Sequence, residues 1–122
     1  MNTNKVADSI LTKLEEIHTR VYRNTPPKNP IFPYVVFDCE TISDSYPSDD
    51  YYIYVNVFEA PNESVRNMND IADLIDGLDN SVIDTEDLNM HIKKVNRQFI
   101  SNSEMTRSKA INLQYSARVY FK

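Results

Sequence analysis

Glycine is almost missing from this sequence of 122 residues, in which Gly77 is the only one. The phosphate-binding loops of Walker and dinucleotide-binding proteins need several glycines, because their backbone must approach the phosphates closely. This scarcity excludes both classes of nucleotide site. Cysteine is equally scarce, and the single Cys39 has no partner for a disulfide within the chain.

Long apolar runs and an excess of positive charge are missing as well. The apolar runs fall far short of the roughly 20 residues that cross a bilayer, so no membrane partner is expected. Residues 1–8 carry neither the basic nor the apolar part of a signal peptide, which predicts a protein that starts in a cytosol. With 13 Lys and Arg against 18 Asp and Glu, the formal net charge is −5. We therefore expect no sequence-specific nucleic-acid binding, and we interpret the basic run 91–97 as a solvated strand face.

What the sequence does contain is the pattern of one α+β domain over residues 1–122. Apolar side chains at spacings of three and four predict two amphipathic helices. The first helix is expected to end at Val21-Tyr22, and the second is expected to begin near Asn62 or Ser64 and to end at Gly77. The apolar stripes that define them are Val6, Ile10, Leu14, Ile17 and Val21, then Val65, Met68, Ile71, Ala72, Ile75 and Leu78.

Four further segments alternate apolar and polar side chains, or are rich in β-branched and aromatic residues, as strands are. They are residues 34–42, 51–59, 88–100 and 110–121. The proline-rich segment 24–33 is expected to be an extended connection, and segments 43–50, 79–87 and 101–109 are expected to be loops. The order helix-strand-strand-helix-strand-strand predicts two helices on one face of a four-stranded, mostly antiparallel sheet.

One strand carries a pair of carboxylates with a chemical meaning. The segment around Asp38 and Glu40 resembles the first motif of the 3′–5′ exonucleases, Phe-Asp-x-Glu-Thr, whose two acids can hold divalent metal ions on one side of a strand. The chain has Ile42-Ser43 where that family has Thr-Gly, and after residue 91 it has one acid, Glu104, and no histidine. We therefore expect both carboxylates on the solvent face of the sheet, and keep a metal-dependent exonuclease as the alternative function.

Other ligand sets are not evident. His18 and His91 have no neighbours at the spacing of zinc ligands, so no metal and no cofactor are expected. A small regulatory or ligand-binding module is a third interpretation, because the same architecture hosts many functions. A conspicuous pocket would favour it.

Taken in order, the features of the chain resemble those of the phage tail-completion or tail-terminator family, the head–tail joining proteins of long-tailed phages. The resemblance covers nearly the whole sequence and lies in the opening helix, the proline-rich stretch, two strands and the second helix. The segments that carry it are Val21-Tyr22, 33–37, 51–59, 71–75 and 113–121.

The resemblance implies a structural protein without catalytic residues. Such a protein forms a ring with copies of itself, expected to be a hexamer, which ends the tail tube and meets the head connector proteins. Its partners are then itself, the tail-tube protein and the connector. It is assembled in the host bacterial cytoplasm and ends in the tail of the virion.

The residues expected to touch partners come from two features of the sequence. Polar loops longer than ordinary hairpin turns are candidates for contact, and so are tyrosines on a strand face that the helices do not cover. The candidates are Tyr46, Asp49, Asp50, Tyr52, Tyr54, Arg107 and Lys109.

Overall fold

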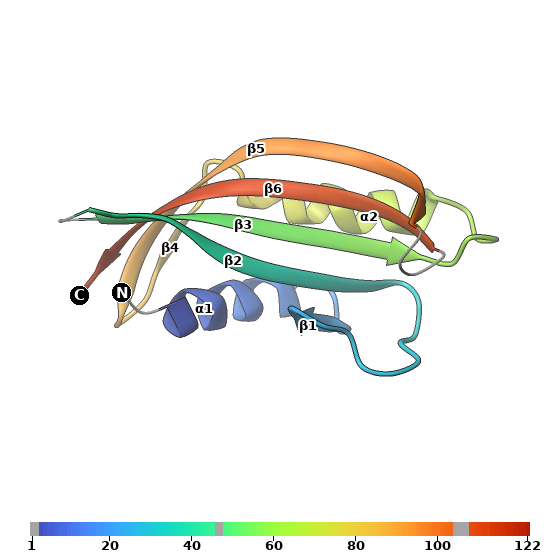
Figure 1. Cartoon of the computed structure of the whole chain (residues 1–122), viewed down its shortest axis with the longest axis horizontal. Coiled ribbons are helices and arrows are strands. Elements are labelled where there is room, and N and C mark those ends of the chain that lie inside the picture. Colours follow the sequence, from blue (N-terminus) through green and yellow to red (C-terminus); the bar gives the residue numbers. More distant parts are fainter. Residues whose placement is uncertain (1–2, 46–47, 104–107) are drawn as a thin grey trace.

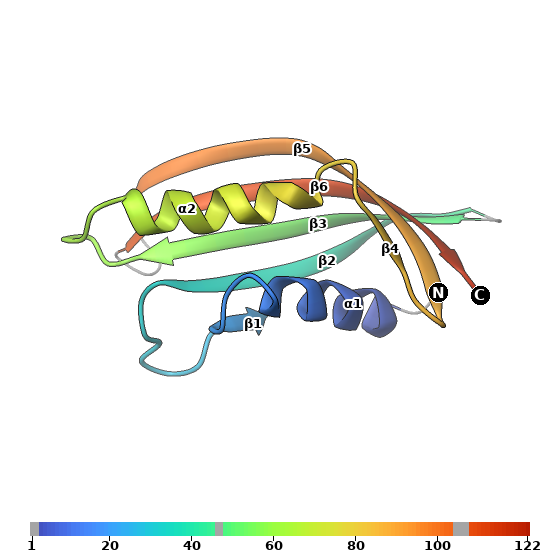
Figure 2. The same ribbon diagram turned by 180° about the vertical axis from the view of Figure 1, so that it is seen from behind.

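The computed structural model describes residues 3–45, 48–103 and 108–122. In this part of the chain two helices and six strands form one α+β unit, drawn from two sides in Figures 1 and 2. The sheet order is β1-β2-β3-β6-β5-β4. In chain order the elements are α1 (Thr3–Glu15), β1 (Val21–Arg23), β2 (Tyr34–Ser45), β3 (Ser48–Glu59), α2 (Arg66–Ile75), a 3₁₀ turn (Asp76–Leu78), β4 (Val82–Asp84), β5 (Leu88–Ser103) and β6 (Ser108–Phe121).

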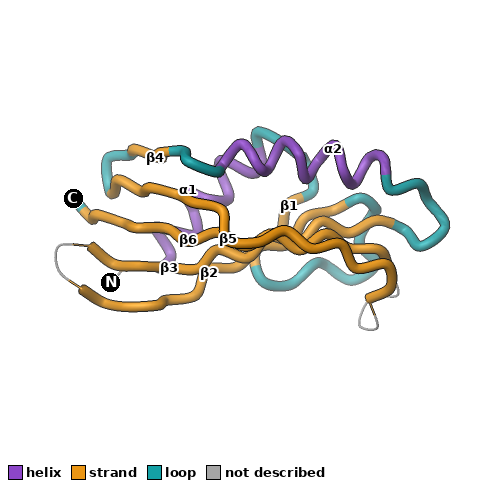
Figure 3. Tube along the Cα trace, turned by 90° about the horizontal axis from the view of Figure 1, so that it is seen from above, coloured by secondary structure: helices purple, strands orange, loops and turns teal. Residues whose placement is uncertain are grey.

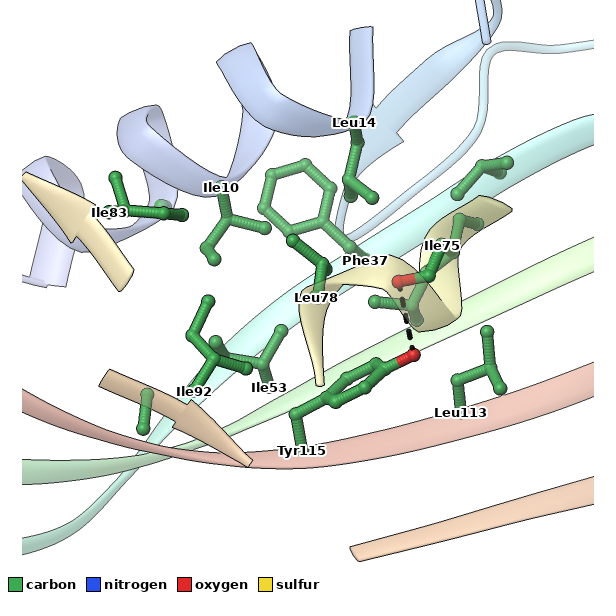
Figure 4. Close-up of a cluster of buried hydrophobic side chains, with 14 of the residues drawn as sticks. Ile10, Leu14, Phe37, Ile53, Ile75, Leu78, Ile83, Ile92, Leu113 and Tyr115 are labelled. Atoms are coloured by element: carbon green, nitrogen blue, oxygen red, sulfur yellow. Dashed lines mark hydrogen bonds between the residues drawn. The ribbon is translucent and has the colours of Figure 1, made fainter. Parts of the chain in front are cut away.

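Both helices lie on one face of the sheet, as expected from the sequence (Figure 3). The apolar stripe of each helix is buried against the alternate residues of β2, β3, β5 and β6 that point the same way. Figure 4 shows Ile10 and Leu14 of α1 meeting Phe37 of β2, with Ile75 and Tyr115 farther along the same core. The strict alternation of burial along β3 and β6 leaves the other face, here called the open face, without a helix.

The expectation for the end of the first helix is wrong. α1 ends at Glu15, and Val21–Arg23 pairs as a strand in parallel with β2. The turn begins where the backbone N–H groups of Ile17 and His18 both donate to Leu14 O. His18 Nε2 and Arg20 Nε then lie 2.8 and 3.1 Å from Pro33 O, which fixes the chain beside β2. Sheet pairing has therefore overridden a helical spacing of apolar residues.

The expected sheet of four strands is too small, since β1 and β4 were not expected. β4 lies inside segment 79–87 and pairs antiparallel with β5. Segments 43–50 and 101–109 are not loops over their described length, because β2 and β3 continue to Ser45 and from Ser48, and β5 and β6 continue to Ser103 and from Ser108. The strand ends in these stretches are rich in Ser and Asp, which are typical of turns, so the sequence predicted loops where the strands continue.

The second helix has the expected buried face but different ends. α2 begins at Arg66, where Ser64 Oγ accepts the backbone N–H of Arg66 at 3.2 Å. It ends at Ile75, and Gly77 lies in the following 3₁₀ turn without a positive φ. The left-handed residue of this region is Asn80, with φ of 60°. No described helix is long and apolar enough to span a membrane.

Candidate assembly surface

The open face has one end covered by aromatic rings. Tyr34 of β2 stacks on Phe58 of β3 with ring centroids 5.0 Å apart, and Phe32 from the proline-rich connection lies 5.4 Å from Tyr34. These contacts leave Tyr34 only 1% exposed, although it lies on the side of the sheet away from the helices. The aromatic excess of the sequence is therefore partly used to close this end of the open face.

The other end of the open face is polar and carries charges in rows across the strands. In one row Glu40 of β2, Tyr52 of β3, Ser116 of β6 and Lys93 of β5 are successive cross-strand partners. This row begins with an acid and ends with a base. Cross-strand partners on one face have Cβ atoms within about 5.5 Å of each other, so the register alone makes the row continuous.

A second row, two residues farther along the strands, also has its basic side chains on β6 and β5. It joins Asp50, Arg118 and His91. Arg118 Nε lies 3.6 Å from Asp50 Oδ1, and 62% of the Arg118 side chain remains exposed. The ring of His91 meets Tyr120 edge to face at 6.0 Å. Basic groups therefore gather on β5 and β6.

A hollow of about 560 Å³ lies over this basic region. Its lining includes His91, Lys93, Arg118 and Asp50 from the open face, Ile42 from β2 and Val82 from β4. Two cationic side chains, Lys93 and Arg118, and the imidazole of His91 against one carboxylate make the hollow suited to an anionic group, even though the whole chain is acidic. The basic run at 91–97 was the feature of the sequence that indicated this basic region. Arg118 could be assigned to it only from the pairing of β5 with β6.

Asp38 and Glu40 lie on the open face, as expected, while the apolar residues between and before them face the helices. Asp38 Oδ1 accepts the backbone N–H of Cys39 at 2.8 Å, and Glu40 is hydrogen-bonded to Tyr54. Within the described ranges no group of three or more His, Cys, Asp or Glu residues is placed to hold a metal ion. The third carboxylate that a two-metal nuclease requires therefore has no counterpart in that part of the chain.

The thiol of Cys39 is half-buried against the core. Burial, with a smaller effect of the neighbouring Asp38 charge, raises its pKa to about 12. A thiol with so high a pKa is hardly ionised at neutral pH and is a poor nucleophile.

The structure brings together some of the predicted partner contacts. Asp49, Asp50, Tyr52 and Tyr54 all lie on β3 at the polar end, with the two tyrosine rings 6.1 Å apart. Lys109 lies at the opposite end of the sheet, where its Nζ donates to Glu63 O at 2.5 Å. Tyr46 and Arg107 lie outside the described residues.

Two sheet edges are exposed to new strands in the described part of the chain. β1 pairs with β2 over three positions ending at Phe37, so β2 from Asp38 onward has no outer neighbour there. β4 covers β5 as far as His91, and Ser81 O accepts the N–H of Ile92. The backbone N–H of Lys94 donates to Asp79 Oδ1 at 2.9 Å, and beyond it Val95 and Phe99 are about half exposed. Such edges are templates for pairing with another chain.

No protein-family model matches this chain, and no curated protein sequence does. Solved structures do resemble it in fold. A protein of the virion of a native gene transfer agent particle has a TM-score of 0.63 at 18% identity, over 88% of this chain and 84% of the other. A second solved protein, whose name describes no function, has a TM-score of 0.66 at 14% identity, over 95% and 96%. The fold is therefore one that a virion component uses.

Proposed function

We propose that this chain is a structural protein of a phage or prophage virion. It assembles as a ring at the head-proximal end of the tail, ends the tail tube and joins it to the head connector. The observation that carries the proposal is the fold shared with a protein of a gene transfer agent virion along most of both chains. The order of elements that resembles the tail-completion family supports the same assignment.

Two properties of the surface support assembly over catalysis. The edge of β2 from Asp38 onward and the edge of β5 beyond Lys94 offer backbone donors and acceptors for further strands. In the row that begins at Glu40, the open face has an acid on the β2 side and Lys93 on the β5 side. A contact between two different patches of the same chain repeats with the same orientation, and it closes a ring where the rotation allows.

Gold labelling of tail tubes tests the proposed place of the protein. Tubes from the phage that encodes the chain are mixed with the protein carrying a small gold particle on a C-terminal tag, and imaged by negative-stain electron microscopy. We expect label at one end of each tube. Label spread along the tube, or none above the background of an unrelated gold-labelled protein, would contradict the proposal.

A further inference from the structure

The row Glu40–Tyr52–Ser116–Lys93 places opposite charges on opposite flanks of the same end of the sheet. Each neighbouring pair in the row is a backbone register partner. With strands about 4.8 Å apart, the acid and the base are separated by about 14 Å along the row. No ion pair within the described part of the chain involves Glu40, Asp38 or Lys93.

Each flank is accessible to another protein. Asp38 and Glu40 lie on β2 beyond the three positions that β1 covers. Lys93 lies on β5 just past the three positions that β4 covers. The backbone N–H groups of Ile92 and Lys94 on either side of it donate to Ser81 O and Asp79 Oδ1, so another copy reaches this position through the exposed Lys93 side chain. Both Glu40 and Lys93 are exposed in the free chain. Charged side chains on an edge strand commonly limit unwanted pairing with other chains. A partner that carries the opposite charge at the facing position is then favoured over one that does not.

The strand directions allow the two flanks to meet. β2 is antiparallel to β3, β3 to β6, and β6 to β5, so β2 and β5 run in opposite directions. When the β2 flank of one copy approaches the β5 flank of the next copy in the same orientation, the two strands are therefore antiparallel. This is the favourable sense for pairing with the part of β5 beyond Lys94, which neither β4 nor Asp79 covers.

We propose that the acidic flank (Asp38 and Glu40) of one copy docks against the basic flank (His91, Lys93 and Arg118) of the next copy. The partner is a second copy of this chain, because the complementary charges and the opposed strand directions are both present in one molecule. The contact is head to tail, so every subunit uses one acidic and one basic flank. This interface rests on the proposed ring function and names the surfaces that build it.

Charge reversal on each flank tests the interface. The variants are Glu40→Lys, Lys93→Glu, and both changes in one chain, measured by native mass spectrometry over a concentration series up to millimolar at low and at high salt. We expect the wild type to form one closed oligomer that weakens with salt. Each single reversal should weaken assembly at least tenfold, and the double variant should recover it, because the reversed charges again attract.

Matched controls separate the interface from net charge and from folding. Glu15→Lys and Lys28→Glu make the same changes at exposed positions outside both flanks, and they should leave assembly unchanged. Circular dichroism melting establishes that each variant folds. Inorganic phosphate serves as a probe of the hollow, and its binding without any assembly would overturn the proposal in favour of a small-anion site.

Other results would also overturn it. These are single reversals that assemble like the wild type, a double variant that folds but stays unassembled, and a wild type that remains a monomer over the whole series. Gold label on tube ends together with unaffected reversals would leave the proposed function standing and remove only this interface. Rings that respond as expected but never bind tubes would keep the interface and remove the function.

Discussion

Replacing Asp76 with asparagine tests whether polar contacts hold the end of α2 to the sheet. One carboxylate oxygen of Asp76 accepts the Tyr115 hydroxyl at 2.8 Å. The other lies 2.6 Å from Arg97 Nη1 and 3.3 Å from Lys94 Nζ. These partners belong to β5 and β6, so one side chain joins the helix end to two strands. Asparagine keeps the shape of the side chain and removes its charge.

We expect Asp76→Asn to lower the free energy of unfolding by about 2 kcal/mol, since hydrogen bonds to a charged group contribute about 1.5–3 kcal/mol. The Asp76 side chain is only 18% exposed, which limits screening by water. In a chain of this size the loss corresponds to a fall of about 8 °C in Tm, measured by circular dichroism at neutral pH. Asp73→Asn is the control, because Asp73 lies 2.8 Å from the same Arg97 but is 66% exposed. Its loss should stay below about 1 kcal/mol.

The pH dependence follows from the pKa of Asp76. Burial pushes this pKa up, but hydrogen bonds from Tyr115, Arg97 and Lys94 outweigh burial and hold it below the ordinary value of 3.8. A carboxylate whose pKa is depressed on folding contributes stability that is full above its unfolded pKa. That contribution is lost as the pH falls through the folded pKa. The difference in Tm between wild type and Asp76→Asn should therefore be constant from neutral pH to about pH 5 and shrink below 3.8.

Equal losses for Asp73→Asn and Asp76→Asn would refute this reasoning, because the more exposed carboxylate would then matter as much as the one bonded to Tyr115. A difference in Tm that persists undiminished in strong acid would refute the electrostatic part.

Three further predictions concern the core, the thiol and the carboxylates. Val55 is 0% exposed beneath the helices, so Val55→Asp buries an unpaired charge and should abolish the cooperative melting transition, while a folded variant would contradict the packing described. Because burial raises the pKa of Cys39 to about 12, an aromatic disulfide reagent at neutral pH should label it slowly in the folded chain and rapidly in urea, and equal rates would show that the thiol is accessible. Purified protein with Mg²⁺ or Mn²⁺ should leave single-stranded DNA intact, whereas cleavage that Asp38→Ala removes would restore the exonuclease interpretation.

Much of the fold could be predicted because its core is strongly patterned. The stripes of α1 and α2 and the alternation of β6 correspond directly to buried positions. The short strands could not be predicted from pattern, since β1 and β4 each have three residues and form by pairing with an existing edge. Val21 fits the helical stripe as well as it fits a strand. The pairing of β1 with β2 and the contacts of His18 and Arg20 with Pro33 O decide between them.

The candidate surface was predictable only in part. The alternation of β3 showed that Tyr52 and Tyr54 share a face away from the helices. Which residues lie across from them depends on the register, and irregularities between Thr41 and Ser43 and between Lys94 and Asn96 shift it. The placement of Glu40 and Lys93 in one row across the sheet could therefore not be predicted from the sequence.

Electron microscopy of particles made without this chain tests the central claim most directly. The gene is inactivated in the phage or prophage that encodes it, and tail lengths and head attachment are compared with those of particles made when the wild-type chain is supplied from a plasmid. Our proposal predicts tails of irregular length and unjoined heads and tails without the chain, and normal particles once it is supplied. Normal tails joined to heads in its absence would contradict the proposal.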